Sequence, residues 1–269
     1  EEGLMEKYFE ECALSEEELS KGLTIALSKQ QFYPLFIASG LKDMGSGRIM
    51  GFIDDIAPSP AERPKRVLEN GEEVAYDHND KTTIFIYKTV SEPQVGLVSY
   101  FKVITGTVKP GDELINSNGE VERITQLFVS EGRDRIAVPQ LLAGDLGVTV
   151  KLKSTHTNNT LNSKGVDRVV RPMQFPESRI RKAISTESAA DMEKLIKALH
   201  QIEEEDPTLI VEQNATLKQT IIHGQGQLHL DLIKYRIEKA FGVHMEFERP
   251  KIPYRETITQ VANEVYRHK

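Results

Sequence analysis

The stretch from residue 179 to residue 247 reads RIRKAISTESAADMEKLIKALHQIEEEDPTLIVEQNATLKQTIIHGQGQLHLDLIKYRIEKAFGVHMEF, and it carries the clearest fold signal in the chain. The spacing of its apolar residues switches between the two-residue period of strands and the helical period. Asp206-Pro207 ends the first helical run, because proline has no amide hydrogen to donate within a helix. The predicted elements are strand 180–186, helix 188–205, strands 209–211 and 220–222, helix 227–240 and strand 243–247. This βαββαβ order predicts a ferredoxin-like domain.

Both predicted helices carry one apolar face. In the first, Ser188 and Asp191 resemble a capping box, with Asp in place of the usual Glu. Its apolar stripe is Met192, Leu195, Ile196, Leu199 and Ile202. In the second, Ile233, Ile237 and Phe241 are expected to point inward.

The segment 82–153 has the two-residue period of short strands. Asn118-Gly119 is a strong signal for a two-residue hairpin. Val121, Ile124 and Leu127 are expected to continue one strand after that hairpin. The other predicted strands are 82–87, 95–104, 113–115 and 146–150, with turns at 109–112 and 143–145. Short strands with closely spaced turns favour a small antiparallel β-barrel or sandwich.

The first 60 residues predict an α/β fragment without a core of its own. Ser15 to Glu18 form a capping box at the start of a helix, residues 31–38 have strand composition, and residues 49–56 carry a helical apolar face. Residues 1–20 hold eight Glu and one Lys, so the net charge of −7 lies within them. We interpret this part as the tail of a larger α/β domain. Residues 61–80 are expected to be a linker and a loop.

Composition and charge narrow the class of protein. The chain has 269 residues, 39% hydrophobic and 28% charged, which is typical of globular domains. No apolar run approaches the roughly 20 residues that span a bilayer, and residues 1–4 do not resemble a signal peptide. Cys12 is the single cysteine, so no internal disulfide is possible. The expected location is the cytoplasm, without membrane contact. The local basic clusters are Arg133 with Arg135, Lys151 with Lys153, and Arg179 with Arg181 and Lys182.

Three motifs could indicate a phosphate, metal or anion site. Residues 106–111 have the glycine spacing of a phosphate-binding loop, but Asp112 and Glu113 follow where Lys and Ser or Thr are needed. The sequence has no Asn-Lys-x-Asp and no Asp-x-x-Gly. His223, His229 and His244 lack the usual zinc spacing, and we interpret His229 as a packed or hydrogen-bonded side chain. Residues 224–226 predict a tight turn that brings a helix close to the sheet, or less favourably an anion site.

An ordered set of motifs resembles the elongation factor G family. Glu204-Glu205-Asp206-Pro207-Thr208 resembles its Glu-Asp-Pro-Thr, residues 224–230 resemble its Gly-x-Gly-Glu-Leu-His-Leu, and residues 254–258 resemble its Tyr-Arg-Glu-Thr-Ile. Residues 106–111 and 143–145 look like turns of its barrel domain. Residues 58–60 look like the exit from its GTPase domain. The resemblance covers essentially the whole chain.

The resemblance implies four regions. Residues 1–60 would be a remnant of the GTPase domain, 61–172 the barrel of domain II, 173–250 the ferredoxin-like domain III, and 251–269 the start of domain IV. The parent would be a monomeric GTPase that moves tRNA and messenger on the ribosome, contacting ribosomal RNA, ribosomal proteins and its own GTPase domain. GTP and Mg²⁺ are expected in the parent and not in this fragment.

The resemblance also assigns a site. Ser39, Gly40 and Leu41 fall where the family has a guanine-recognition loop with a Ser-Ala pair, but here Gly40 follows Ser39. Gln227 replaces the family's Glu. No catalytic and no metal-binding residue is assigned. The alternatives are a divergent paralogue or a ribosomal protection factor on the same scaffold. A self-contained enzyme would need a cluster of catalytic groups, which the sequence does not indicate.

Overall fold

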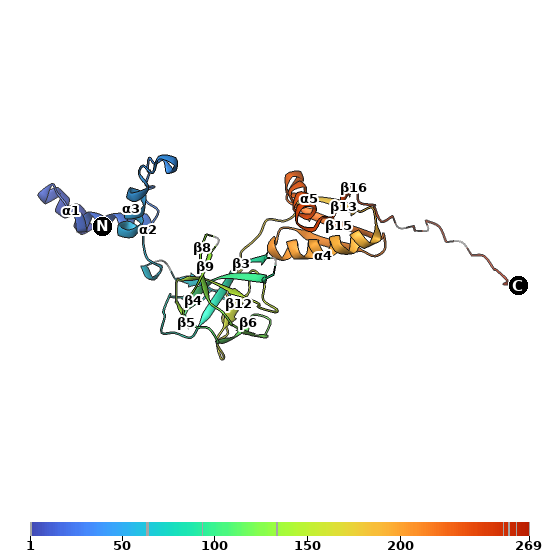
Figure 1. Ribbon diagram of the computed structural model, residues 1–269, viewed down its shortest axis with the longest axis horizontal. Coiled ribbons are helices and arrows are strands. Elements are labelled where there is room, and N and C mark those ends of the chain that lie inside the picture. The colour runs from blue at the N-terminus through green and yellow to red at the C-terminus, as the bar shows by residue number, and fades with distance from the viewer. Residues whose placement is uncertain are drawn as a thin grey trace. The chain divides into compact units, whose positions relative to one another are not determined.

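The computed structural model describes residues 2–62, 65–92, 94–132, 134–254, 256–257, 259–261 and 263–268. These residues fold as two compact units (Figure 1). The first comprises residues 1–87 and 100–172, and the second residues 88–99 and 173–269. Each unit is described separately below.

The second unit contains a four-stranded sheet with the βαββαβ connectivity predicted from the sequence. Its elements are β13 (Ile180–Ser185), α4 (Ala189–Glu205), β14 (Ile210–Asn214), β15 (Gln219–Gly224), α5 (Gln227–Phe241) and β16 (Glu246–Glu248). The strand order is β14-β15-β13-β16, and every neighbouring pair is antiparallel. This is the topology of the ferredoxin-like fold, so that prediction is confirmed.

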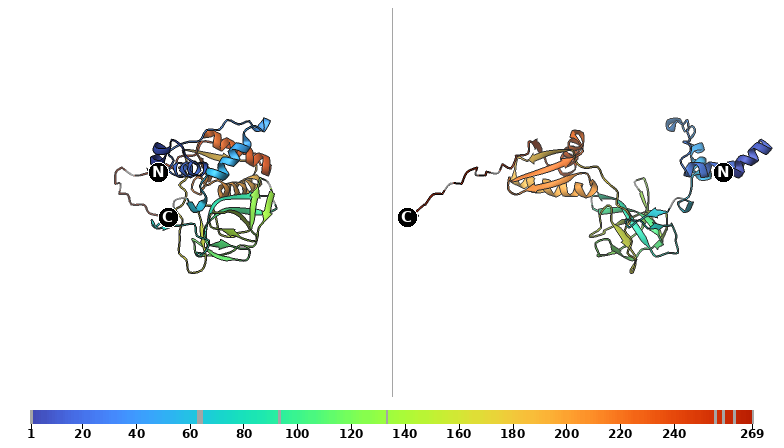
Figure 2. Two further views of the ribbon diagram at one scale, coloured as in Figure 1. Left: turned by 90° about the vertical axis from the view of Figure 1, so that its left-hand side faces the viewer. Right: turned by 180° about the vertical axis from the view of Figure 1, so that it is seen from behind.

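Both helices lie against this sheet (Figure 2). A single hydrophobic core joins them to it. Leu195 and Leu199 of α4 and Ile237 of α5 are fully buried. They pack with Ile222 of the central strand β15. The helical spacing in the sequence therefore identified the buried faces. Phe241 is an exception, because it is 38% exposed and not turned inward as predicted.

Local sequence sets the helix ends in this unit. The Ser188 hydroxyl accepts the backbone amide of Asp191, as expected for an N-cap. Gly242 adopts a left-handed conformation just after α5, where a residue with a side chain would be strained. Strand β16 begins at Glu246 and not at Val243, whose side chain is instead buried in the core.

The first unit contains the antiparallel β-barrel. Its main strands are β3 (Thr83–Glu92), β4 (Gly96–Thr105), β6 (Glu113–Asn116), β7 (Val121–Arg123), β8 (Phe128–Glu131), β9 (Asp134–Ala137), β11 (Leu146–Val150) and β12 (Thr160–Asn162). They form one sheet in the order β7-β6-β12-β3-β4-β11-β8-β9. Strands β5 (Thr107–Val108) and β10 (Leu141–Leu142) pair separately. The predicted fold class of this region is confirmed, although residues 88–99, at the tip of the β3–β4 hairpin, group with the second unit.

The barrel core is built from alternating residues of these strands, including Ile84, Ile86, Phe101 and Val103, each essentially unexposed. Gly106 permits a close crossing of the chain at the end of β4. A Cβ atom there would lie 2.6 Å from the Cα of Thr82, and the φ angle is +76°. The glycine of the apparent phosphate-loop motif is therefore required by backbone packing.

Two predictions about this unit are wrong. The strand expected to continue through Ile124 and Leu127 ends at Arg123, because the chain leaves the ladder there while both side chains still enter the core. Residues 61–80 are not only a linker. Strands β1 (Arg66–Val67) and β2 (Glu73–Val74) pair in an antiparallel hairpin, and Leu68 between them is 1% exposed.

The N-terminal part is helical. It contains α1 (Glu2–Glu11), α2 (Glu16–Ser28) and α3 (Ser46–Ile56), with short 3-10 turns η1 (Gly40–Lys42) and η2 (Pro60–Glu62). The capping box at Ser15 and Glu18 is present as predicted. The strand predicted at residues 31–38 is absent, because these residues pair with no strand and have no regular secondary structure. Ile37 is 96% exposed, so the apolar side chains of this segment do not indicate a buried core.

The last residues add no further element that the structure describes. Among the described residues of 251–268, none belongs to a helix or a strand. Arg255 and Ile258 of the motif at 254–258 lie outside the described residues. Within the described part of the chain, every helix is too short or too polar to cross a membrane.

Candidate functional site

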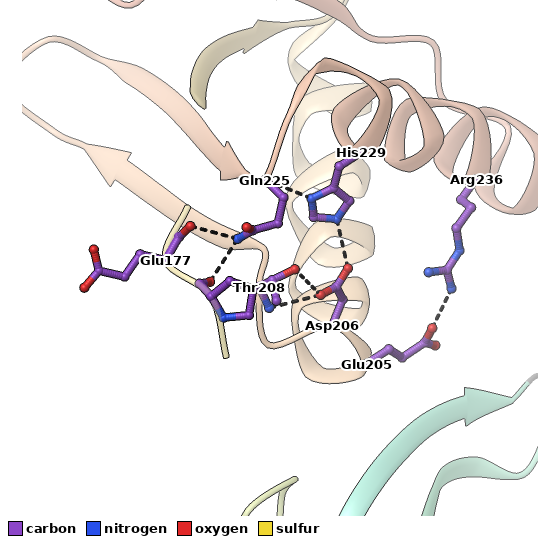
Figure 3. Close-up of polar contacts among 8 residues, drawn as sticks. Glu177, Glu205, Asp206, Thr208, Gln225, His229 and Arg236 are labelled. Atoms are coloured by element: carbon purple, nitrogen blue, oxygen red, sulfur yellow. Dashed lines mark hydrogen bonds and ion pairs between the residues drawn. The ribbon is translucent and has the colours of Figure 1, made fainter. Parts of the chain in front are cut away.

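The ends of the two helices of the second unit meet in a cluster of polar side chains (Figure 3). We call Asp206, Thr208, Gln225 and His229 the helix-junction cluster. Asp206 follows the last residue of α4, where its backbone amide still donates to the carbonyl of Ile202 at 2.8 Å. Pro207 comes next and cannot continue the helix. The local sequence therefore places Asp206 at the point where the chain turns toward β14.

The Asp206 carboxylate holds this turn and reaches to α5. Its Oδ1 atom accepts the Thr208 hydroxyl at 2.6 Å and the Thr208 amide at 3.0 Å. Its Oδ2 atom lies 2.9 Å from Nε2 of His229, in the first turn of α5. Figure 3 shows the imidazole of His229 between Asp206 and Gln225. One carboxylate thus connects the end of α4 with the start of α5.

The hydrogen bonds determine which ring nitrogen of His229 carries the proton. The backbone amide of Gln225 donates to Nδ1 of His229 at 3.1 Å. A backbone amide can only donate, so Nδ1 is the acceptor and the proton of the neutral ring is on Nε2. Nε2–H then donates to Asp206, which is the arrangement that a carboxylate stabilises.

The pKa of Asp206 reflects two opposing effects. Burial raises the pKa of this carboxyl group, since it disfavours the charged form. The hydrogen bonds from Thr208 and from His229 stabilise the carboxylate and outweigh burial, so the pKa lies below its ordinary value of 3.8. Asp206 is therefore ionised at neutral pH, and His229 is 16% exposed beside it.

Gln225 extends the cluster to the chain that enters the unit. Its side-chain Nε2 donates to the carbonyl of Pro176 at 2.9 Å and to that of Glu177 at 3.1 Å. Gly224, just before it, permits the close approach of α5: a Cβ atom there would lie 2.6 Å from Leu230 and 3.0 Å from His229. The predicted tight turn with a close helix–sheet approach is therefore present, and Gly224 provides it.

A second ion pair joins the same two helices. Arg236 of α5 contacts the carboxylate of Glu205, the last residue of α4 (Figure 3). Glu205 is 12% exposed and Arg236 is 43% exposed. The guanidinium geometry suits a carboxylate, and the pair adds a second link on one side of the helix-junction cluster.

The cluster does not have the geometry of a catalytic site. A nucleophile activated by histidine must donate its hydrogen bond to a free ring nitrogen. Here both ring nitrogens of His229 are used, one by Gln225 and the other by Asp206. The Thr208 hydroxyl donates to Asp206 and not to the ring. We conclude that this cluster sets the relative position of α4, α5 and the entering segment.

Comparisons with known proteins agree with the two folds. Residues 175–249 match the family model of elongation factor G, domain III, and residues 96–161 match that of elongation factor Tu domain 2. A crystal structure of a protein from Thermus thermophilus matches with a TM-score of 0.78 at 30% sequence identity. The match covers 95% of this chain and 37% of that chain.

The chain belongs to the elongation factor G-like proteins. Its domains are those of a translation elongation factor-like protein, so the resemblance inferred from the ordered motifs is confirmed. The helix-junction cluster contains the Asp-Pro-Thr motif and the Gly-x-Gly…His motif of that resemblance. Residues far apart in the sequence thus meet in one hydrogen-bonded network.

Ser39, Gly40 and Leu41, the predicted guanine-loop residues of the elongation factor G-like chain, lie in the first unit and not in this cluster. Ser39 and Met44 exchange backbone hydrogen bonds of 2.9 and 3.0 Å around the η1 turn. Leu41 is 99% exposed. The one carboxylate of this loop, Asp43, accepts the Ser46 hydroxyl at 2.6 Å. These residues form a closed turn whose carboxylate is used internally.

The glycine-rich segment and the histidines were the other candidates for nucleotide or metal binding. The sequence has no phosphate-binding Gly-Lys-Ser/Thr loop. Across the described ranges, no three His, Cys, Asp or Glu side chains converge as a metal site would require. His223, His229 and His244 have separate carboxylate partners, which are Glu212, Asp206 and Glu238. The described residues therefore offer no ready set of ligands for the phosphates of GTP or for Mg²⁺.

Sequence reasoning missed two features of the elongation factor G-like chain. It interpreted His229 as packed or hydrogen-bonded but did not identify Asp206 as its partner, which is 23 residues away. It also missed the buried carboxylate of Glu122 in the barrel, which is 3% exposed. For the Asp206–His229 contact, the available sequence signal was an Asp just before a helix-ending Pro. For the burial of Glu122 there was no sequence signal, since this residue stands between exposed residues of an ordinary hairpin.

Proposed function

We propose that this chain is the ribosome-docking and transmitting part of a GTP-dependent translocase that moves tRNA and messenger. In this proposal it works in the cytoplasm as a monomer. The barrel docks on ribosomal RNA and proteins, and the ferredoxin-like domain transmits the nucleotide state of a GTPase domain to the rest of the molecule. The proposed transmission is an interface switch without local chemistry.

The observation that carries the proposal is the order of the two matched domains. An elongation factor Tu domain 2 match at residues 96–161 precedes an elongation factor G domain III match at residues 175–249. The helix-junction cluster supports a transmitting role, because it ties the entering segment at Pro176 to both helices through Gln225. A displacement of that segment would therefore be passed to α5.

The proposed source of GTP and Mg²⁺ binding is a longer parent protein. The chain spans 37% of the Thermus thermophilus protein that it matches, which leaves room for such a domain. Ser39 to Leu41 remain the predicted remnant of its guanine loop. We expect calorimetric titration of the present chain with GTP and Mg²⁺ to show no binding. Micromolar affinity would contradict this assignment.

Competition on the ribosome tests the proposal. The chain is added to ribosomes that carry out translocation driven by an authentic elongation factor G. We expect it to inhibit translocation competitively, so that excess factor restores the rate, because both occupy the same ribosomal surface. A chain with the helix-junction variant Asp206→Asn should compete less well than one with Asp231→Asn. Absence of ribosome binding, or inhibition that excess factor does not relieve, would overturn the proposal.

A divergent paralogue or a ribosomal protection factor is the second candidate. Gln227 stands where the family has Glu, and its amide donates to Asp231 at 2.8 Å. A Glu in its place would put two carboxylates one helical turn apart, which is unfavourable. The departure at Gln227 therefore avoids a like-charge pair with Asp231, and it is the observation that favours this second candidate. Complementation of a cell depleted of elongation factor G by the full-length reading frame separates a main translocase from these alternatives.

A further inference from the structure

The second unit contains a cavity of about 750 Å³ that the helix-junction cluster does not line. Its walls come from α4, from α5 and from described residues at the tip of the β3–β4 hairpin, which belongs to this unit. Small-molecule sites have volumes of about 300–1,000 Å³ and combine apolar walls with a few polar groups. The cavity therefore has the size of such a site.

One carboxylate joins the three walls of this cavity. The Oε1 atom of Glu205 accepts the backbone amide of Ser91 at 3.0 Å, and its Oε2 atom contacts Nη2 of Arg236 (Figure 3). Glu205 is 12% exposed, whereas Arg236 is 43% exposed. A guanidinium has five N–H donors, and the contact with Glu205 uses one of its nitrogen atoms. Donors of Arg236 therefore remain for a bound molecule.

An aromatic ring and aliphatic side chains form the apolar part of the cavity. Ile202 is 2% exposed and Val95 is half-buried. Phe241 is 38% exposed and lines the same cavity, although its helical spacing predicts an inward position. Aromatic rings pair favourably with other rings in offset or edge-to-face arrangements. This wall of the cavity thus suits a flat aromatic ligand.

The charged side chains of the lining decide which kind of aromatic molecule fits. They are the carboxylates of Glu92 and Glu205 and the guanidinium of Arg236, so their charges sum to −1 and disfavour an anion. A cation would need a carboxylate, but Glu205 is bound by Ser91 and Arg236, and Glu92 also has an interaction partner. An uncharged molecule that accepts a hydrogen bond from Arg236 meets neither obstacle.

We propose that this cavity binds an uncharged aromatic molecule that carries a carbonyl acceptor. The aromatic ring of the ligand packs against Phe241 and Ile202, and its carbonyl oxygen accepts a hydrogen bond from Arg236. The inference goes beyond the proposed function, because neither the ribosome nor GTP takes part in it.

The first experiment compares three probes of nearly the same shape and different charge on the complete chain of 269 residues. Benzamide is uncharged, benzoate is an anion and benzamidine is a cation at pH 7. We expect benzamide to bind with a dissociation constant on the order of a few millimolar, and the two ions to bind about fivefold more weakly. Amide NMR titration should show the benzamide shifts at residues 201–205 and 236–241. No binding, equal binding of all three probes, or shifts elsewhere would overturn the proposal.

The second experiment removes the aromatic wall. Phe241→Ala should weaken benzamide binding about five- to tenfold, because the ring contact is lost. The matched control is Leu232→Ala, which truncates a 54% exposed apolar residue of the same helix that does not line the cavity. The control should leave benzamide binding unchanged. Both side chains are exposed, so both variants should keep the amide spectrum of the rest of the unit. An equal loss in the two variants would contradict a role for Phe241.

The third experiment tests the charge argument through the ratio of two affinities. Glu92→Gln brings the summed charge of the lining to zero, so the preference for benzamide over benzoate should shrink about fivefold. Glu187→Gln, at an exposed position outside the cavity lining, should leave the ratio unchanged. If Glu92→Gln does not change the ratio, the assigned ligand class is wrong. All three experiments use the chain alone, so their outcome is independent of the ribosome competition that tests the proposed function.

Discussion

Two pairs of amphipathic helices in this chain differ in how many of their apolar side chains are buried. Helices α4 and α5 together bury Leu195, Ala198, Leu199, Ile202, Leu230, Ile233 and Ile237. Helix α2 buries no residue, and α3 buries Ile56 alone. Large apolar residues remain exposed in the N-terminal part, namely Met5, Tyr8, Phe9, Leu19, Met50 and Ile53. The same helical periodicity therefore accompanies a buried core at α4 and α5 and an exposed apolar face in the N-terminal helices.

This contrast shows how much a helical apolar stripe specifies. The stripe predicts which face should be covered, because burial of apolar area is favourable by about 25 cal/mol per Å². It does not specify what covers that face. In the second unit a sheet formed by the same chain segment does so. In the first 60 residues, residues 31–38 form no strand that could cover the helices.

The largest expected effect is a difference in local stability between the two helix pairs. Amides of α4 and α5 should exchange with solvent at least about a thousandfold more slowly than those of α2 and α3, because the former open only with their core. Native-state hydrogen exchange of the chain measures this. Equal protection of residues 16–56 and 189–241 would remove the basis of the contrast.

Core truncation should reproduce the difference as an unfolding free energy. Leu199→Ala, at a position with 0% exposure, should destabilise the second unit by about 2–5 kcal/mol. The matched change Ile53→Ala on α3, where the residue is 53% exposed, should alter stability by less than about 0.5 kcal/mol. Urea denaturation followed by circular dichroism gives both values. A loss at Ile53 comparable to that at Leu199 would show that α3 has a core after all.

The helix-junction cluster adds polar interactions to one helix pair only, because it connects α4 with α5. Asp206→Asn should cost about 1–3 kcal/mol, because its amide cannot accept from both Thr208 and His229 as the carboxylate does. Asp231→Asn on the exposed side of α5 is the control.

The pKa of Asp206 is lowered in the folded state, so the stabilisation by its carboxylate is present above the ordinary pKa of 3.8 and is lost as pH falls below it. The stability gap between wild type and Asp206→Asn should therefore shrink in acid, and a gap that is constant down to about pH 2 would exclude this role.

The smallest effect is expected at the ion pair between α1 and α2. Lys7 Nζ lies 2.6 Å from Glu18, and this contact, with the Ser15 amide and hydroxyl, lowers the pKa of Glu18 from 4.5 to about 2. The associated stabilisation is present above pH 4.5 and is lost as pH falls toward 2. Carboxyl NMR titration should give that midpoint, and high salt should move it upward. Glu18→Gln should shift the unfolding midpoint less than Asp206→Asn, and a larger shift would refute this ranking.

Much of the candidate site could be anticipated from residues near one another in sequence. Ser188 predicted the beginning of α4 and Pro207 its end, and Gly224 predicted the close turn before α5. The pairing of Asp206 with His229 could not be anticipated, because it depends on how the two helices pack across the sheet. Phe241 shows the same limit: its spacing fits the buried face, but it is the last residue of α5 and is 38% exposed.

Local patterns in the sequence were sufficient for the two fold classes, the family and most helix boundaries, since periodicity, capping and turn residues act over a few positions. The enclosure of polar side chains emerged only from the packed fold. Glu122 and Asn116 look like ordinary hairpin residues in the sequence, yet the crossing of residues 151–155 beside their strands buries both. Burial depends on segments that meet across long separations along the chain, and local patterns carry no information about those encounters.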